Sequence, residues 1–235
     1  MICFIKKKWH HWKELLSDKK YRISLLAGFA LLLIAYYLNY TATLYTSEIP
    51  VLSVGDLILD HIPTLDLSVM FTFGIYLVAA IVTIYPLVFK PELLPFAAKT
   101  VAAFIIIRSG FISMTHLGAP EGYFRLPGIE DQPGLTKFFY MNDLFFSGHT
   151  GFPFLAALLF WENKWLRWFM LAMSVGQSFT VLFMHVHYSI DVFSAYFITY
   201  TIYVVSDKIF NKLNLSFRLI VKAAELKMRQ FTHRE

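Results

Sequence analysis

The sequence predicts an all-α, polytopic membrane protein with six transmembrane helices in a bundle. Of its 235 residues, 57% are hydrophobic and only 16% are charged, whereas roughly a quarter of the residues of a soluble domain are charged. The apolar residues also gather in runs of nearly membrane-spanning length. A single cysteine, Cys3, excludes a disulfide framework and a cysteine-based metal site.

Six apolar runs, bounded by Gly, Pro or charged residues, are the expected spans. The first three are about Ile23–Tyr40, Leu67–Phe89 and Leu94–Met114. The fourth begins just after His149 and runs to about Trp161, and the last two are about Trp165–Met184 and Ile190–Val205. The apolar segment Val51–Ile62 is shorter than the roughly 20 residues of a span. We therefore expect an interfacial helix or a loop there.

The distribution of charge predicts the orientation. Lys and Arg precede the first run and follow the last, whereas residues 41–66 contain neither and carry Glu48, Asp56, Asp60 and Asp66. Positive residues stay on the cytoplasmic side, so both termini are expected in the cytoplasm. We divide the chain into a basic cytoplasmic segment, 1–22, a six-helix transmembrane domain, 23–206, and a basic cytoplasmic tail, 207–235. The basic ends suit anionic lipid headgroups, and nucleic acid is not an expected partner.

The motif Ser147-Gly148-His149-Thr150 precedes the fourth span. Gly148 lets the backbone approach a ligand closely, Thr150 is a candidate helix cap, and backbone N–H groups at a helix start attract anions. A histidine beside such a site is suited to protonate a leaving oxygen. By itself, the motif favours a structural cap over catalysis.

A second motif, His185-Val186-His187-Tyr188-Ser189-Ile190-Asp191, precedes the sixth span. On a helix, residues four apart share a face, which pairs His187 with Asp191 and leaves His185 pointing elsewhere. A carboxylate that holds one imidazole nitrogen raises the basicity of the other, as a nucleophilic histidine requires. A structural pair is the alternative. A second alternative is a zinc site with ligands from both motifs, although two histidines two residues apart on one helix are poorly placed to bind the same ion.

Further polar residues fall on the same, outer side of the expected topology. Arg108 ends an otherwise apolar span, where a guanidinium suits a phosphate or a carboxylate; a snorkelling arginine is the alternative. Polar groups at membrane depth are costly and mark function by default. The turn-rich segment 115–148 is a candidate functional lid. An acidic outer group, for which solvated loop charges are the alternative, consists of Asp56, Asp60, His61 and Asp143.

Together, the Ser-Gly-His motif and the histidine followed by an aspartate four residues later resemble the type 2 phosphatidic acid phosphatase (PAP2) superfamily. More narrowly, Asp143–Thr150 and His187–Val192 are similar to two motifs of its sphingomyelin synthase branch. Val181 stands where the phosphatases have an arginine, and their Lys-to-Arg-Pro motif has no match, which favours that branch. Val186, by contrast, stands where the synthases have an acidic residue. Weaker similarities involve Arg108, Thr115, Leu117, Pro120, Asp56, Asp60 and His61.

The resemblance implies a PAP2-like core and a lipid phosphotransferase that needs neither metal nor cofactor. In such an enzyme His187 attacks the phosphorus of a phospholipid, Asp191 orients His187, and His149 protonates the departing diacylglycerol. The headgroup then passes to a lipid alcohol, ceramide or diacylglycerol. With water as acceptor the protein is a lipid phosphatase, and a non-catalytic lipid-binding protein is the third possibility. The implied substrate-binding residues are Arg108, Ser147, Gly148, Asp143, Tyr188, His185, Asp56 and Asp60.

Overall fold

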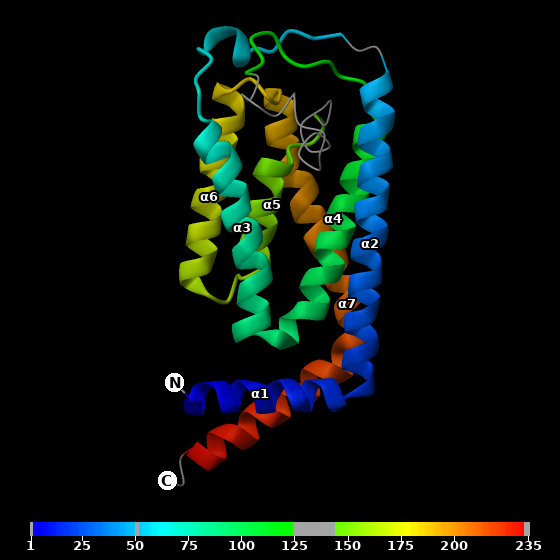
Figure 1. Cartoon of the computed structure of the whole chain (residues 1–235), viewed down its shortest axis with the longest axis vertical. Helices are drawn as coiled ribbons and strands as arrows, with labels where there is room; N and C mark the ends of the chain where they lie inside the picture. The colour runs from blue at the N-terminus through cyan, green and yellow to red at the C-terminus, as the bar shows by residue number, and fades with distance from the viewer. Residues whose placement is uncertain (1, 50–51, 125–143, 233–235) are drawn as a thin grey trace.

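The computed structural model describes residues 2–49, 52–124 and 144–232, and the side chains of residues 9–49, 52–124 and 144–210 within them. These parts of the chain form helices and connecting loops, without a β-strand. Figure 1 shows the long helices side by side as a bundle, with loops across one end and both termini at the other. The all-α helical bundle expected from the sequence is confirmed.

Helix α2 (Lys19–Glu48) packs along α4 (Leu94–Met114). Asp18 begins α2 by accepting hydrogen bonds from the backbone N–H groups of Lys20 and Tyr21, at 2.6 and 2.9 Å. The buried side of α2 carries small residues seven positions apart, namely Gly28, Ala35 and Ala42. A Cβ at Gly28 would lie 3.0 Å from the Cβ of Ala98 in α4. The two backbones therefore approach closely, as small residues allow in membrane helices.

Helix α3 (Ser68–Phe89) leads through the short 3-10 helix η2 (Pro91–Leu93) into α4. It packs mainly on α6 (Lys164–Phe183) and α5 (Gly148–Leu159). The Gln177 side chain of α6 donates its Nε2–H to the Met70 carbonyl of α3, at 2.8 Å. Gly74 leaves the space for this amide, because a Cβ there would overlap with Nε2.

Helix α5 is short and central. Its 12 residues extend about 18 Å, less than the roughly 30 Å of a bilayer's hydrocarbon core. In the described part of the chain, five other segments are long and apolar enough to span: Lys19–Glu48, Ser68–Phe89, Pro91–Met114, Lys164–Phe183 and Ser189–Phe210. The six expected spans thus correspond to α2 through α7 (Ser189–Thr232), with α5 embedded among the others. The main apolar core joins α3 through α7 by buried residues such as Val78, Phe104, Leu155, Met170 and Ala195.

Two loops, residues 52–67 and 115–124, cross the end of the bundle at which α5 and α7 begin (Figure 1). The first contains the 3-10 helix η1 (Leu59–His61), so the described part of Val51–Ile62 confirms the expected loop. The backbone N–H of Gly118 donates to the Leu52 carbonyl at 3.0 Å. A Cβ at Gly118 would lie 2.7 Å from the Leu52 carbonyl carbon, so only glycine permits this contact.

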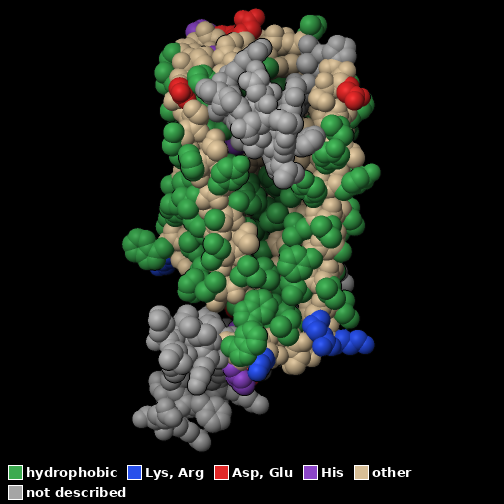
Figure 2. Space-filling model, in the orientation of Figure 1, with side chains coloured by type: hydrophobic (Ala, Val, Ile, Leu, Met, Phe, Trp, Pro, Cys, Tyr) green, Lys and Arg blue, Asp and Glu red, His purple; other side chains and the backbone are tan. Residues whose placement is uncertain are grey.

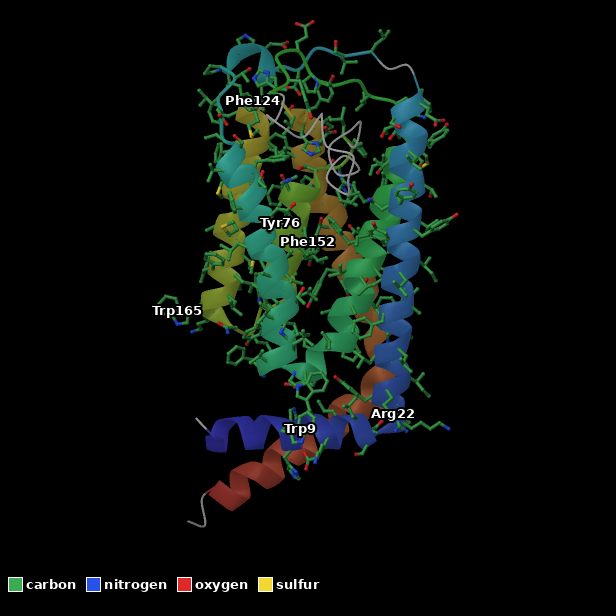
Figure 3. All side chains as sticks on the ribbon, in the orientation of Figure 1. Trp9, Arg22, Tyr76, Phe124, Phe152 and Trp165 are labelled. Atoms are coloured by element: carbon green, nitrogen blue, oxygen red, sulfur yellow. The ribbon has the colours of Figure 1, made fainter. Side chains whose placement is uncertain are left out.

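Helix α1 (Ile2–Ser17) lies across the opposite end of the bundle, near both termini (Figure 1). The Trp12 indole donates to the Leu87 carbonyl at 3.1 Å, and His11 Nε2 lies 3.3 Å from Glu92 Oε2. Figure 2 shows apolar side chains over the middle of the bundle, with acidic residues at the loop end and basic residues at the terminal end. Arg22 and Trp165 point outward near the terminal end (Figure 3), as residues at a membrane interface do.

Two helices are longer than the spans expected from hydropathy. Helix α2 extends beyond Ile23–Tyr40 in both directions, to Lys19 and Glu48. The polar extension of α2 meets no Gly or Pro before Pro50, and within it the Thr43 hydroxyl donates to the Asn39 carbonyl at 2.9 Å. Helix α7 continues beyond Val205 to Thr232, since no Gly or Pro stops it. Hydropathy marks where apolar residues end, and the helices continue past that point.

Candidate active site

The start of α5 is set by Ser147. Its hydroxyl accepts a hydrogen bond from the Thr150 backbone N–H at 3.4 Å, and its carbonyl accepts one from Gly151 at 2.9 Å. Ser147 is therefore the helix cap, and the expectation that Thr150 caps the helix is wrong. The Ser147 N–H donates to the Asp191 carbonyl at 3.0 Å. This bond joins the start of α5 to the first turn of α7, so the two motifs form one unit.

His149 lies in the first turn of α5, and its imidazole stacks on Phe71 of α3. The ring centroids are 3.9 Å apart and the planes differ by 20°, so the stack sets the orientation of the imidazole. Its Nε2 is buried without a hydrogen-bond partner among the described residues. His187 and Arg108 lie near enough to His149 for their positive charges to act on it. An oriented imidazole with an unpaired nitrogen is suited to exchange a proton with a substrate oxygen.

Arg108 of α4 turns its guanidinium toward the start of α5. The residue is 9% exposed, and its Nε–H donates to the Phe146 carbonyl at 2.9 Å. A snorkelling arginine would place its charge in water, so that alternative does not describe Arg108. A Cβ at Gly148 would lie 3.2 Å from Arg108 Nε, which shows how closely the guanidinium approaches this backbone. A buried cation beside a helix N-terminus favours the binding of an anion at that place.

His187 lies in the turn between α6 and α7 and is buried. Its Nδ1 is 2.8 Å from the Leu144 carbonyl oxygen. Because a carbonyl only accepts, this contact requires the hydrogen on Nδ1 and leaves the lone pair on Nε2. Nε2 is then the nitrogen available for attack on an electrophile. The sequence held no signal for Leu144, since any residue supplies a backbone carbonyl.

Asp191 was expected to share a helical face with His187, and this expectation is wrong, because α7 begins at Ser189, after His187. The two side chains still approach, with Asp191 Oδ2 3.5 Å from His187 Nδ1. That separation is too long for a good hydrogen bond, and the contact becomes an ion pair only when His187 carries a positive charge. Oδ2 accepts its short hydrogen bond from the Tyr188 N–H, at 2.9 Å. Asp191 Oδ1 is buried without a hydrogen-bond partner in the described part of the chain.

Asp56, in the loop 52–67, binds backbone at two places. Its Oδ2 accepts from the Ser189 N–H at 2.7 Å, and its Oδ1 accepts from Ile58 and Leu59 at 2.9 and 3.1 Å. Burial raises the pKa of Asp56, but the hydrogen bonds from Ser189, Leu59 and Ile58 outweigh it. The pKa therefore lies below its ordinary value. Asp56 thus holds the start of α7.

Tyr188 connects the same turn to both loops. Its hydroxyl donates to the Gly118 carbonyl at 2.8 Å and accepts from the Val54 N–H at 3.1 Å. The residue is 1% exposed, and burial raises the pKa of its phenol above the ordinary value. A neutral phenol is the form that donates to Gly118. Asp56 and Tyr188, both expected to bind substrate, therefore bind backbone in the structure.

His185 holds the loop 115–124 by a different contact. Its Nδ1 lies 2.8 Å from the Glu121 carbonyl, while its backbone has a φ of 51°, uncommon for a residue other than glycine. Asp60 is exposed in η1, and its Oδ1 is 3.5 Å from the Asp56 N–H donor.

Of the residues expected in the site, the structure brings together Ser147, Gly148, His149, Arg108, His187 and Asp191. Asp143 and most of the candidate lid lie outside the described residues.

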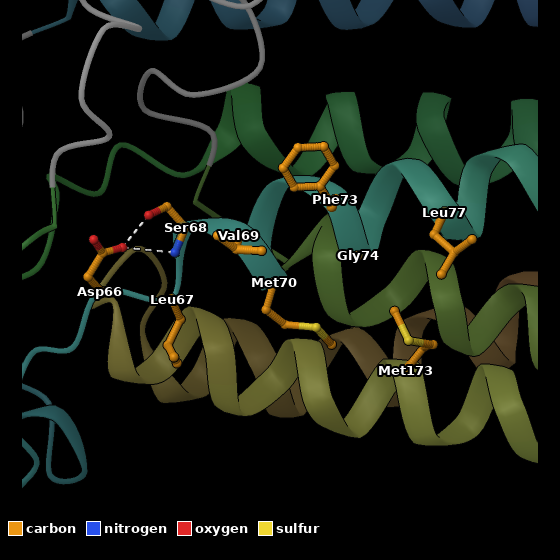
Figure 4. Close-up of a pocket in the computed structure, with 9 residues that line it drawn as sticks. All are labelled: Asp66, Leu67, Ser68, Val69, Met70, Phe73, Gly74, Leu77 and Met173. Atoms are coloured by element: carbon orange, nitrogen blue, oxygen red, sulfur yellow. Dashed lines mark hydrogen bonds between the residues drawn. The ribbon is translucent and has the colours of Figure 1, made fainter.

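An apolar groove of about 510 Å³ lies between α3 and α6, with Asp66 at one end and Met173 on its α6 side (Figure 4). Neither His149 nor His187 lines it, so it is separate from the histidine site. Within the residues that the structure describes, no three His, Cys, Asp or Glu side chains meet as metal ligands would.

Residues 142–208 match a family model described as PAP2 superfamily C-terminal. The match contains His149, His187 and Asp191, and Arg108 and Asp56 lie outside it. No curated protein matches the chain, and neither does any solved structure. The long apolar helices are consistent with a multi-pass membrane protein. The family match shows that residues 142–208 are similar to the C-terminal part of PAP2 superfamily proteins.

Proposed function

We propose that this protein is a membrane lipid phosphotransferase. It moves a phospho-headgroup from a glycerophospholipid to a lipid alcohol, ceramide or diacylglycerol, through a phosphohistidine intermediate. The observation that carries the proposal is the 2.8 Å contact between His187 Nδ1 and the Leu144 carbonyl. It leaves the Nε2 lone pair for attack, in a site that also holds His149 and Arg108.

In the first step, His187 Nε2 bonds to the phosphorus while the bond from phosphorus to the diacylglycerol oxygen breaks. A proton passes from His149 Nε2 to that oxygen, and neutral diacylglycerol leaves. The carboxylate of Asp191, 3.5 Å from Nδ1, stabilises the positive charge that forms on His187. Arg108 and the start of α5 stabilise the phosphoryl oxygens.

In the second step, the hydroxyl oxygen of the acceptor bonds to phosphorus and the N–P bond breaks, which restores His187. The hydroxyl proton passes to His149, which is then ready for another cycle. A lipid alcohol as acceptor gives a new phospholipid or sphingolipid. Water as acceptor gives the phosphatase that is the second candidate function.

One observation favours transfer over hydrolysis. Val181, at the position of the phosphatase arginine, is fully buried in an apolar cluster with Phe71, Met184, Val186 and Val192. No cation reaches the phosphate from this position of α6, so the site departs from the phosphatase pattern here. We further propose that both termini are cytoplasmic and that the site faces the opposite side, which the separation of acidic and basic ends supports.

The test uses purified protein in detergent with phosphatidylcholine or phosphatidylethanolamine and, as acceptor, ceramide or diacylglycerol. Wild type and His10→Ala, which changes an exposed histidine of α1, are expected to form the transferred lipid, and His187→Ala is not. Absence of transfer, together with release of inorganic phosphate in a parallel assay with phosphatidic acid, would identify the phosphatase. Lipid binding without any turnover would establish a non-catalytic protein and refute both.

A further inference from the structure

We propose that Asp56 and Tyr188 are positioning residues that hold the His187 turn in its reactive orientation by fixing it to the two outer loops. This inference rests on the proposed function, in which His187 is the nucleophile. We call these contacts the Asp56–Tyr188 link. It consists of the bonds from Asp56 to Ser189, and from Tyr188 to Gly118 and Val54.

Asp56 supplies the cap that the start of α7 would otherwise lack. The first backbone N–H groups of a helix have no partner within it. Ser189, the first residue of α7, donates its N–H to Asp56 Oδ2 at 2.7 Å. Asp56 lies in a loop 133 residues away in the sequence. The other oxygen of the same carboxylate accepts from Ile58 and Leu59. One buried carboxylate thereby fixes η1 and the start of α7 to each other.

Tyr188 makes the complementary connection from the turn outward. Its hydroxyl lies between the Gly118 carbonyl and the Val54 N–H, one from each loop. Its backbone N–H donates to Asp191 Oδ2, and the residue directly follows His187. The orientation of His187 and Asp191 therefore depends on where the loops hold Tyr188. Gly118 in turn bonds to Leu52, so the two loops support the tyrosine together.

The link acts on a residue that has no helix to hold it. His187 lies outside α6 and α7, and its contact with Leu144 sets which nitrogen carries the hydrogen. A shift of about 1 Å in a reacting group costs on the order of 100-fold in rate. Loss of the link is therefore expected to lower kcat while KM, set by groups that bind lipid, changes little. A role in stability alone would lower the melting temperature and leave kcat of the folded protein unchanged.

The experiment compares Asp56→Asn and Tyr188→Phe with two controls, Asp66→Asn and Tyr76→Phe. Asp66 is an exposed outer-loop aspartate that accepts from Ser68 at the start of α3, and Tyr76 is an exposed tyrosine of α3. Turnover is measured below the melting temperature of each variant. Both link variants are expected to lose about 10- to 100-fold in kcat, with KM within about threefold, and both controls are expected to match wild type.

A second measurement separates positioning from general damage. Nitrogen-15 NMR of histidine-labelled protein in detergent reports which ring nitrogen of His187 carries hydrogen, with His187→Ala used for assignment. Wild type is expected to show hydrogen on Nδ1, and the link variants a mixture of tautomers. Wild-type kcat in both link variants, or lost kcat with an unchanged His187 tautomer, would overturn the proposal. If wild type transfers no headgroup, the proposed function fails, and the tautomer of the variants still decides whether the link positions His187.

Discussion

Gly151→Ala tests whether α4, α5 and α7 meet as closely as the structure shows, two residues from His149. A Cβ on Gly151 would lie 2.8 Å from Thr199 Oγ1 of α7 and 3.0 Å from the Phe104 ring of α4. Both neighbours are buried, so neither moves away easily. Alanine gains about 1 kcal/mol of helix propensity over glycine, but overpacking of a core costs about 1–3 kcal/mol. The close contacts on two sides place the cost toward the upper value, for a net loss of about 1–2 kcal/mol.

The assay is thermal unfolding in detergent, followed by tryptophan fluorescence. A loss of about 1–2 kcal/mol corresponds to a fall in Tm of about 2–8 °C for a chain of this length. Gly110→Ala in α4 is the matched control, because nothing lies within 4 Å of a Cβ there; its Tm is expected to equal or exceed that of wild type. A Gly151→Ala protein as stable as wild type would refute the close approach of the three helices.

Three further predictions concern individual side chains. Phe71→Leu removes the ring on which His149 stacks. Turnover is expected to fall about tenfold, which is a fraction of the rate that general acid–base catalysis contributes. Unchanged turnover would show that the stack has no role. Lys99→Met removes a buried ammonium that donates to Ser24 at 2.6 Å. The Tm of this variant is expected to equal or exceed that of wild type, because the cost of burying a charge disappears. Ser24→Ala, by contrast, is expected to lower Tm. The pKa of Asp56 is lowered in the folded protein. Its stabilising effect is therefore fully present above its unfolded pKa of about 3.9 and is lost as pH falls through the lower folded value. Limited proteolysis of the loops 52–67 and 115–124 at decreasing pH is expected to show this loss in wild type, while Asp56→Asn, with no carboxylate to protonate, shows no such step.

Features of the fold that depend on hydropathy were predictable. Apolar runs located α2 through α7 because the bilayer demands apolar side chains wherever a helix meets lipid. The ends of α2 and α7 were not predictable in this way, since helices continue beyond the apolar run while no Gly or Pro stops them. The short length of α5 was predicted, but its start was not, because the Ser-Gly-His motif offers Thr150 as a candidate cap beside Ser147, which caps the helix in the structure.

The candidate site was predictable in its residue types and not in its contacts. The four-residue spacing selected His187 and Asp191, although they meet across a turn that precedes α7 and not along a helix. The carbonyl of Leu144 and the ring of Phe71 carry no sequence signature, because one is backbone and the other is an ordinary apolar residue of a span. Asp56 was recognised as important, but its bond to Ser189 joins residues 133 positions apart, which no local pattern reveals.

The most direct test of the central claim, that His187 forms a covalent phosphohistidine, is to trap that intermediate. Protein in detergent is mixed with phospholipid labelled in its phosphate, quenched under alkaline conditions within one turnover, and digested to locate the label. The label is expected on the peptide that contains His187 in wild type and in His10→Ala, and is expected to be absent from His187→Ala. Label that persists in His187→Ala, or wild-type turnover without any labelled protein, would contradict a phosphohistidine on His187.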